Sequence, residues 1–523
     1  MTTRSQEAAT DVAALLRARN PLLWIVTREE ARVERHLFQA AAKAGYGPLT
    51  WDCGQGTCDG LTGREMPEFG GPDLGEVLSV IRARSQGQNQ RNVWVMRDLT
   101  PWLAGPIGIV NVRRLRNLAR TLPGTPRGCA QAIIVISPSG EVPAELAGHA
   151  TVIDWPLPDR EEIAEMLRTS VPEELADQMT DQLRDAAVDA AVGLSGEEAQ
   201  NCFARSLVQI KGIDPALIAR EKKRVIARER VLEWYDPLPG GLDAVGGLDL
   251  LKKWLVQRRT AYSAEARAYG LPAPKGMLLL GPPGTGKSLT AKAVATAWEE
   301  PLLKVDLGAL RSKFVGESEA NLRRALRTIE AVGRCVVWLD EIEKSLAGAT
   351  DGAADGGVSQ DVLGTILTWM QERRGEAFVI ATANDVSKLP PELLRKGRFD
   401  EVWWVDLPNT LERVEVLKAS LRQFGRAEAK IDCNEVSTKC DGYTGAEIAA
   451  LVPDALFSAF ADGEREVTTE DLVAAARDVT PLSKTMEKRI TDLRNWAKGR
   501  ARPATSDKAI SDQRRSDRRE LDI

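Results

Sequence analysis

The sequence predicts an α/β protein built on a parallel sheet with helices on both faces, and three observations support this fold class. From about residue 240, short apolar runs alternate with helical stretches, which is typical of parallel strands joined by crossover helices. A glycine-rich loop directly follows the first run. The stretch 411–479 is predicted to be helical and to follow the sheet as a subdomain. The predicted strands are Met277–Leu280, Leu302–Val305, Cys335–Leu339, Phe378–Ala381 and Val402–Val405.

The N-terminal half contains a second set of similar elements. An amphipathic helix is expected over residues 1–20, followed by a strand at 22–27 and a helix at 28–44. The stretch 53–75 is rich in glycine and polar residues and is expected to be a loop. Further elements are predicted as buried strands at 93–96 and 132–136, helices at 157–212 and a charged linker helix at 214–234.

The composition excludes several classes of protein. Of 523 residues, 43% are hydrophobic and 28% charged, as in globular rather than disordered chains. A net charge of -5 argues against a protein whose whole surface binds nucleic acid or an anionic membrane. No apolar run reaches the ~18 residues of a membrane span, and charges interrupt the N-terminus, so a cytoplasmic protein is expected. Cys53 and Cys58 are close in sequence, but ordinary thiols are expected there rather than zinc ligands.

Two pairs of segments about 250 residues apart indicate an internal repeat. The segment 142–159 resembles 389–409, and Gly193–Ala199 resembles Gly442–Ile448. The N-terminal half is therefore interpreted as a diverged copy of the C-terminal half. The alternative is a chance similarity between helices flanked by proline and glycine.

The loop Gly281–Ser288 matches the phosphate-binding pattern G-x-x-x-x-G-K-[ST]. It lies between a predicted strand and the predicted helix Leu289–Trp298, which is the context that the motif requires. Glycines allow backbone N–H groups to curl around phosphate oxygens, and the helix N-terminus adds a favourable dipole. In this pattern Lys287 contacts the β- and γ-phosphates, and the hydroxyl of Ser288 binds Mg²⁺.

Two carboxylates, Asp340 and Glu341, end the predicted strand at 335–339. Asp340 is expected to hold the Mg²⁺ shell, and Glu341 is expected to orient and polarise the attacking water. Alone, an Asp-Glu pair after a strand is usually just a helix N-terminus. Here it follows Lys287 by about fifty residues, which favours the catalytic interpretation.

These motifs resemble the AAA+ ATPases, in the clade of AAA proteins proper. The resemblance rests on the loop 281–288, on Trp338–Lys344 and on Leu393–Asp400, and it covers about 240–480. It implies a P-loop NTPase core with a helical lid.

Within that clade the chain is most similar to the conserved hypothetical chloroplast reading-frame AAA ATPases of algae, cyanobacteria and other bacteria. The segments 264–272 and 481–486 support this, as does the N-terminal half. The implied organisation is a degenerate AAA-like domain at 1–212, a linker helix at 213–239, the AAA+ α/β core at 240–406, a helical lid at 407–497 and a disordered tail at 498–523.

The resemblance also implies roles for individual residues. Asn384 matches sensor 1, which helps to place the attacking water. Arg395 and Arg398 match arginine fingers that reach the γ-phosphate of a neighbouring subunit. The residues implied to bind the nucleotide are Ala244, Gly246, Pro283, Gly284, Thr285, Gly286, Lys287, Ser288, Leu289, Gly445 and Ala446.

The segment Phe314, Val315 and Gly316 matches the aromatic-hydrophobic-glycine pore loop of the family. Two positions depart from the family pattern. Ala244 stands where the family usually has aspartate, and Ser420 stands where many members have a lid histidine. These departures put the nucleotide affinity and preference in doubt, but not the fold.

The N-terminal half lacks the motifs that bind nucleotide. No glycine loop or Lys-Ser pair follows the strand at 22–27, and Arg97-Asp98-Leu99 stands where the Asp-Glu pair would be. No arginine-finger stretch lies between Leu146 and Val152. It is interpreted as a degenerate AAA-like domain that binds no nucleotide. The alternative is an unrelated α/β recognition domain.

The function that the resemblance implies is Mg²⁺-dependent ATP hydrolysis by a homo-oligomeric ring, most commonly a hexamer, that remodels an unknown protein or protein complex. A ring is implied because the arginine fingers serve a neighbouring subunit. An ATP-gated regulatory or scaffolding switch without threading is the alternative. A DNA-handling AAA+ machine is a further alternative. The pI of about 5.6 and the lack of a recognisable nucleic-acid-binding module argue against this alternative.

Overall fold

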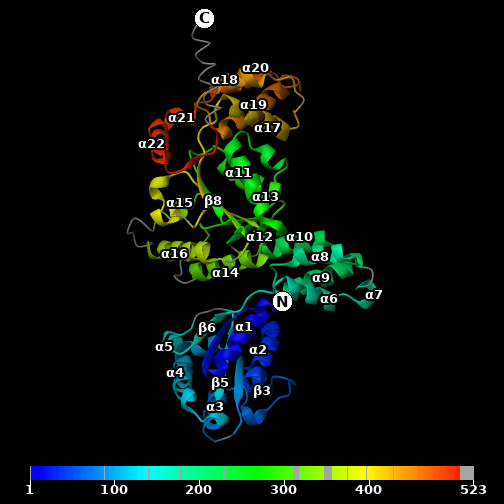
Figure 1. Cartoon of the computed structure of the whole chain (residues 1–523), viewed down its shortest axis with the longest axis vertical. Coiled ribbons are helices and arrows are strands. Elements are labelled where there is room, and N and C mark those ends of the chain that lie inside the picture. Colours follow the sequence, from blue (N-terminus) through cyan, green and yellow to red (C-terminus); the bar gives the residue numbers. More distant parts are fainter. Residues whose placement is uncertain are drawn as a thin grey trace. The chain divides into compact units, whose positions relative to one another are not determined.

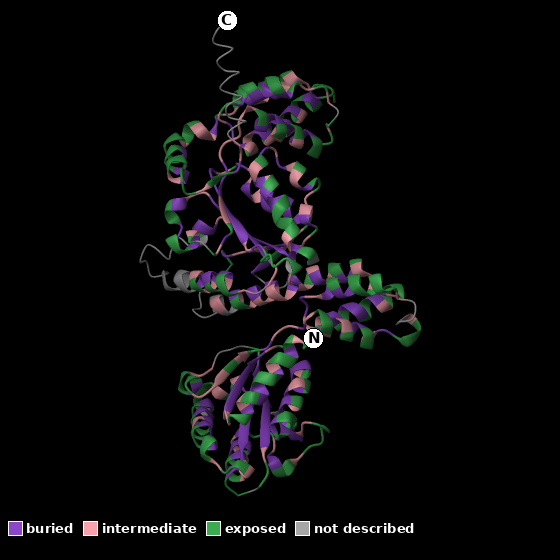
Figure 2. Ribbon diagram, in the orientation of Figure 1, coloured by how far each residue is buried: buried purple, intermediate pink, exposed green. Residues whose placement is uncertain are grey.

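The computed structural model describes residues 2–87, 89–138, 142–176, 179–227, 231–309, 317–346, 356–373, 375–395, 397–427 and 429–506 (Figure 1). The chain divides into two compact units, Met1–Lys222 and Lys223–Ile523. In both units the sheet strands are largely buried, whereas the helices expose one face (Figure 2). Within the described part of the chain, no helix is long and apolar enough to cross a membrane.

The N-terminal unit contains a six-stranded sheet. Its strands are β1 (Leu22–Val26), β2 (Gly47–Asp52), β3 (Gly56–Asp59), β4 (Asn92–Arg97), β5 (Gln131–Ser137) and β6 (Thr151–Asp154). Their order is β3-β2-β4-β5-β1-β6, and neighbours are parallel except for the antiparallel pair β2 and β3. The expected loop at 53–75 therefore contains a short edge strand.

Helices cover both faces of this sheet, because successive strand residues point to opposite sides. The helices are α1 (Arg4–Arg17), α2 (Glu30–Ala44), α3 (Leu74–Gly87), α4 (Gly105–Thr121) and α5 (Ala144–Ala147). Trp24 packs in a core with α3 and α4, whereas Leu23 and Ile25 pack with α1 and α2. A helical group follows, with α6 (Arg160–Ser170), α7 (Glu173–Ala176), α8 (Asp181–Ala191), α9 (Gly196–Ile210) and α10 (Pro215–Ile226).

The C-terminal unit contains a seven-stranded sheet. Its strands are β7 (Leu232–Tyr235), β8 (Gly276–Leu280), β9 (Leu302–Val305), β10 (Val336–Leu339), β11 (Phe378–Ala383), β12 (Glu401–Trp404) and β13 (Arg502–Pro503). Their order is β13-β12-β8-β11-β10-β9-β7, with only β7 antiparallel to its neighbour. The five strands predicted from the apolar runs are confirmed as β8 to β12.

Two layers of helices cover this sheet. On one face lie α11 (Asp249–Arg259) and α13 (Lys287–Trp298), whose side chains share a core with Met277 and Phe378. The core of the other face includes α14 (Glu317–Val332), α16 (Gly356–Glu372) and α22 (Glu487–Ala497). The shorter helices are α12 (Ala264–Ala268), α15 (Ile342–Leu346) and α21 (Leu482–Thr485).

The predicted helical lid is present as a four-helix group with its own apolar core, but it ends with α20 and not at 497, because α22 packs against the sheet. It consists of α17 (Thr410–Gln423), α18 (Cys433–Lys439), α19 (Gly445–Ala461) and α20 (Thr469–Asp478). The N-cap residues Asn409 and Thr444 begin α17 and α19 with capping boxes, which satisfy the first backbone N–H groups of each helix.

The two units share part of their sheet topology. In each, the first parallel strand lies between two later parallel strands, β1 between β5 and β6 and β8 between β11 and β12, and an antiparallel strand closes one edge. The capping boxes also correspond: Asp159 and Asn409 begin α6 and α17, and Ser195 and Thr444 begin α9 and α19. These correspondences support the interpretation of the N-terminal half as a diverged copy.

Two predicted segments differ in the structure. The stretch 213–239 is not a continuous linker helix, because β7 follows α10 and pairs with β9 as an edge strand. The tail is not disordered from 498, because β13 pairs with β12 and Ala504 is only 1% exposed. Residues 507–523 lie outside the described residues. β13 has only two residues, and β7 is an edge strand in which only Leu232 is buried, so neither strand leaves a run of apolar residues in the sequence.

Candidate nucleotide-binding site

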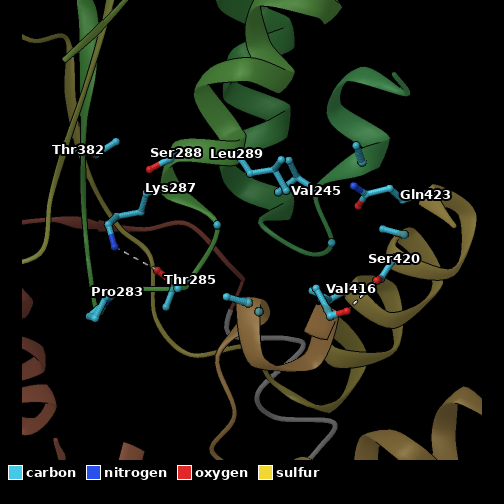
Figure 3. Close-up of a pocket in the computed structure, with 18 of the residues that line it drawn as sticks. Val245, Pro283, Thr285, Lys287, Ser288, Leu289, Thr382, Val416, Ser420 and Gln423 are labelled. Carbon is cyan, nitrogen blue, oxygen red and sulfur yellow. Dashed lines mark hydrogen bonds between the residues drawn. The ribbon is translucent and has the colours of Figure 1, made fainter. Parts of the chain in front are cut away.

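A cavity of about 340 Å³ lies between the carboxyl end of the sheet and the lid. Figure 3 shows Lys287 and Ser288 from the glycine-rich loop on one side, and Val416, Ser420 and Gln423 from α17 on the other. Except for Asp340, Arg395, Arg398 and the pore-loop residues, the predicted site residues all line it. They are Ala244, Gly246, Pro283, Gly284, Thr285, Gly286, Lys287, Ser288, Leu289, Glu341, Asn384, Gly445 and Ala446.

The glycine-rich loop joins β8 to α13 in a backbone conformation that only glycine adopts readily. Gly284 and Gly286 have φ angles of 77° and 91°. A Cβ atom on Gly284 would also lie 2.9 Å from the hydroxyl of Thr444 at the start of α19. The carbonyl of Gly284 accepts a hydrogen bond from the backbone N–H of Ala446 at 2.9 Å. The loop and the lid helix are therefore in direct contact.

Lys287 lies at the first turn of α13 and is 5% exposed. Its ammonium donates to the carbonyl oxygens of Gly281 and Pro282, at 2.9 and 2.6 Å. Burial lowers the pKa of this ammonium to about 8, although nearby carboxylates, with that of Glu343 foremost, favour the charged form. A phosphate at the loop would add negative charge beside the ammonium and hold it in the protonated state.

Ser288 and Asp340 form an oxygen pair at the edge of the cavity. The Ser288 hydroxyl donates to the Asp340 carboxylate at 3.0 Å, and the Thr382 hydroxyl donates to the same oxygen at 2.7 Å. Mg²⁺ prefers such oxygen donors and usually binds through one or two protein groups plus substrate phosphates. The donor set therefore fits Mg²⁺. In the described parts of the chain, no cluster of three or more His, Cys, Asp or Glu side chains offers a metal site.

Glu341 is held at the same strand edge by two neighbours. The amide of Asn384 donates to one of its carboxylate oxygens at 3.0 Å, and Lys344 pairs with the other at 2.5 Å. Its backbone N–H donates to Thr382, and its φ angle of 46° is in the left-handed region. A non-glycine residue there is uncommon and is often found at functional sites.

Sequence reasoning missed several residues of the site. Glu343 is 3% exposed and accepts the backbone N–H of Asn384 at 3.0 Å, and burial raises the pKa of its carboxyl group. It lies two residues after Glu341, so its position in the Asp-Glu-Ile-Glu run was the feature of the sequence that could have indicated a place in the site. The cavity residues that were not assigned to binding from the sequence are Thr382, Val416, Ala419, Ser420, Gln423 and Ala449.

The two predicted arginine fingers do not reach this cavity. Arg395 is exposed, and the guanidinium of Arg398 donates to the backbone carbonyl of Glu392. Neither is among the described residues that line the cavity. The predicted pore loop, Phe314, Val315 and Gly316, lies outside the described residues.

The comparisons with known proteins agree with this geometry. Residues 277–407 match the family model described as "ATPase family associated with various cellular activities (AAA)", and 430–474 match an AAA+ lid domain. An uncharacterized AAA domain-containing protein ycf46 from Pyropia yezoensis is 36% identical, over 95% of this chain and 99% of its own length. The chain belongs to the AAA ATPase family.

Other similar proteins and domain models extend this likeness. The ycf46 protein of Guillardia theta is 35% identical, covering 93% of this chain and 94% of its own. A cell division cycle protein 48 homolog of Archaeoglobus fulgidus is 32% identical over 54% of this chain and 38% of its own length. Residues 8–155 match a SpoVK-like AAA ATPase N-terminal domain, and 161–229 match the second domain of such proteins. Two models thus match where the sequence predicts one domain.

The corresponding place in the N-terminal unit of this AAA protein is filled by its own side chains. After β1, Glu29 pairs with Arg32 at 2.6 Å, and both are about 5% exposed. The Glu29 carboxylate also accepts the backbone N–H of Gly196, the first residue of α9. In the AAA unit, Gly445 begins the equivalent helix beside the phosphate-binding loop. The start of this helix thus contacts a side-chain carboxylate in the N-terminal unit, whereas in the AAA unit it contacts the backbone of the glycine-rich loop.

The strand end that corresponds to Asp340 carries a different residue in the N-terminal unit. Arg97 ends β4 and pairs with Glu34 at 2.6 Å and Asp52 at 3.2 Å. The next residue, Asp98, has a φ angle of 46°, the same as that of Glu341. The strand end therefore shares this φ angle with the AAA unit but carries a guanidinium where that unit carries the carboxylate of Asp340.

Proposed function

We propose that this AAA protein hydrolyses ATP in a Mg²⁺-dependent reaction at the cavity between the sheet and the lid. The observation that carries the proposal is the convergence of Lys287, Ser288, Glu341 and Asn384 from three separate strand ends. Lys287 would bind the β- and γ-phosphates, and Glu341, held by Asn384, would orient the attacking water.

Ser288 and Asp340 would hold Mg²⁺, whose charge would neutralise the phosphate oxygens during transfer. Thr382 supports this assignment because its hydroxyl fixes the Asp340 carboxylate at 2.7 Å. Ala244 and Gly246 would contact the adenine from the core, and Gly445 and Ala446 would close over it from the lid. Pro283 to Leu289 would wrap around the phosphates.

A ring of identical subunits is the assembly that best explains the two arginines. Arg395 and Arg398 do not line the described walls of their own cavity. An arginine supplied to the γ-phosphate by a neighbour is worth about 10³–10⁵ in rate, so a neighbouring subunit would complete the site. AAA+ ATPases commonly assemble as hexamers, and we propose a hexamer for this chain.

We further propose that the ring remodels a protein or a protein complex, with Phe314, Val315 and Gly316 as its pore loop. Phe314→Ala should then leave basal ATP hydrolysis within a few-fold of wild type and abolish remodelling. Full biological activity of this variant would instead favour the second candidate, an ATP-gated assembly switch. Stimulation of turnover by DNA, and not by protein, would favour a nucleic-acid substrate.

The central experiment compares ATP turnover of wild type and Glu341→Gln, with and without Mg²⁺. The variant should bind ATP and barely hydrolyse it, since only water activation is removed. Glu470→Gln, at an exposed carboxylate of α20, is the matched control and should keep the wild-type rate. Wild-type turnover by Glu341→Gln would refute the assignment. The same variant, loaded with ATP, is the trap with which to capture and identify the partner.

A further inference from the structure

We propose that the segment Arg502–Ser506, called here the C-terminal strap, positions the adenine end of the nucleotide cavity. Thr505 is the positioning residue, and it acts through Glu412 of α17. The proposal rests on the proposed binding of ATP at that cavity.

The strap is anchored to the edge of the sheet. Arg502 and Pro503 pair with Trp403 and Trp404 of β12, and the guanidinium of Arg502 lies 4.8 Å from the ring centre of Trp403. The backbone N–H of Ala504 donates to the carbonyl of Trp404 at 2.9 Å, and Ala504 is 1% exposed. The strap therefore has a fixed register on the core.

Beyond the sheet, the strap caps α11. The N-cap residue of α11, Leu248, has a φ angle of 60° and no side chain that can accept a hydrogen bond. The carbonyl of Ala504 accepts the N–H groups of Leu250 and Leu251, at 3.1 and 3.2 Å. The N–H of Ser506 donates to the carboxylate of Asp249 at 2.9 Å. The strap thus supplies the acceptor that Leu248 lacks.

The strap then reaches the lid through Thr505. Its hydroxyl donates to Oε1 of Glu412 at 2.6 Å, a short distance typical of a hydrogen bond to a charged acceptor. Glu412 is 8% exposed, and the same oxygen accepts the N–H of Leu248 at 3.1 Å. One carboxylate oxygen therefore joins the strap, the start of α11 and the lid.

Glu412 lies against the loop that lines the adenine end of the cavity. A Cβ atom on Gly247 would lie 2.4 Å from Oε1 of Glu412, so the two are in close contact. The neighbouring Gly246 lines the cavity and packs on Val416, one turn after Glu412 on α17. A shift of Glu412 would therefore move both the loop and the α17 wall of the cavity.

The N-terminal unit gives an independent comparison. Glu162 occupies the place of Glu412 in the corresponding capping box, and it also accepts a hydroxyl hydrogen bond, from Ser5 at 3.0 Å. There the hydroxyl comes from α1 itself, which has its own capping box at Thr3. In the AAA unit the strap supplies both the cap of α11 and the hydroxyl that binds Glu412. These two contacts account for the ordered path of the strap.

The experiment measures binding of ATP and of inorganic tripolyphosphate in the full-length Glu341→Gln background, where turnover is suppressed. Thr505→Val keeps the shape of the side chain and removes the hydroxyl. It should weaken ATP binding about three- to tenfold. This loss is smaller than the full contribution of one hydrogen bond to a charged group, because Thr505 acts on the cavity only through Glu412. Binding of tripolyphosphate should not change, because the phosphate-binding loop is untouched.

Thr505→Ser should restore ATP affinity, and Ser506→Ala should not alter it, since the backbone N–H of Ser506 makes its bond to Asp249. Truncation after Ser506 should bind ATP normally, whereas truncation after Gly499 should bind it weakly. Unchanged ATP affinity in Thr505→Val, or equal losses for ATP and tripolyphosphate, would overturn the proposal. Absence of all nucleotide binding in the unmodified background would instead refute the proposed function.

Discussion

The side-chain amide of Asn384 donates a hydrogen bond to the carboxylate of Glu341, with 3.0 Å between Nδ2 and Oε1. The two residues follow neighbouring parallel strands, β11 and β10, so the sheet itself sets their separation. The backbone N–H of Asn384 is also fixed, by the buried carboxylate of Glu343. The direction of the Glu341 carboxylate therefore depends on Asn384.

We predict that Asn384→Ala lowers kcat for ATP hydrolysis at least tenfold, while KM changes less than about threefold. The amide acts on the water-orienting carboxylate rather than on ground-state binding, and general-base catalysis contributes ~10²–10⁴ in rate. Steady-state kinetics of Asn384→Ala, Glu341→Gln and the double variant test this. Fully multiplicative losses in the double variant would contradict a shared role.

The second prediction concerns Lys287 and pH. Burial lowers the pKa of its ammonium to about 8, and the protonated form is the one that attracts phosphate. ATP affinity should therefore be full below this pH and should fall by about tenfold per pH unit as the pH rises above it. Titrations of Glu341→Gln with ATP between pH 7 and pH 10 measure the effect.

Lys287→Arg is the control for that titration, because a guanidinium stays charged over the whole range. Its affinity for ATP should be weaker but independent of pH. A wild-type lysine site with constant affinity up to pH 10 would show that its ammonium is not deprotonated there.

The third prediction concerns Arg395 and Arg398. Arg395→Ala or Arg398→Ala should bind ATP normally and hydrolyse it poorly. Mixing either variant with Lys287→Ala should restore part of the activity, since one subunit supplies the loop and its neighbour supplies the arginine. Rates of the mixed assemblies are measured after co-assembly has been verified. No recovery in a verified mixed ring would place the arginines in a role within their own subunit.

Much of the AAA unit could be predicted from the sequence, because its motifs follow strands with clear apolar runs. Lys287, Glu341 and Asn384 each stand just after such a run, and the carboxyl ends of parallel strands meet at one edge. The cavity residues from the lid were harder to predict. Val416 and Ala419 are ordinary apolar residues of a helix, and only the packing of α17 on the core brings them to the site.

The strap and the filled site of the N-terminal unit could not be predicted for a different reason. Thr505 and Glu412 are 93 residues apart in the chain, and their contact depends on a two-residue strand with no periodicity. Glu29 and Arg32 resemble any charged pair at the start of a helix. Only the folded unit shows that they are buried against α9.

The last prediction concerns this buried pair in the N-terminal unit. Arg32 donates to Glu29, to Ser5 at 2.7 Å and to the carbonyl of Pro156 at 2.6 Å. Removing one partner of a buried ion pair leaves an uncompensated charge and costs roughly 3–5 kcal/mol. Arg32→Met should therefore destabilise the N-terminal unit strongly in denaturant unfolding, whereas Arg35→Met, at an exposed position of the same helix, should not.

The same pair explains why the N-terminal unit should bind no nucleotide. A buried ion pair stands after β1 where a glycine-rich loop would be needed, and the unit has no equivalent of Lys287 there. Full-length Lys287→Ala should therefore bind no ATP at all, and wild type should bind one ATP per chain. Calorimetry gives both stoichiometries. Micromolar ATP binding that persists in Lys287→Ala, and is lost when the N-terminal unit is unfolded by Arg32→Met, would reveal a second nucleotide site there.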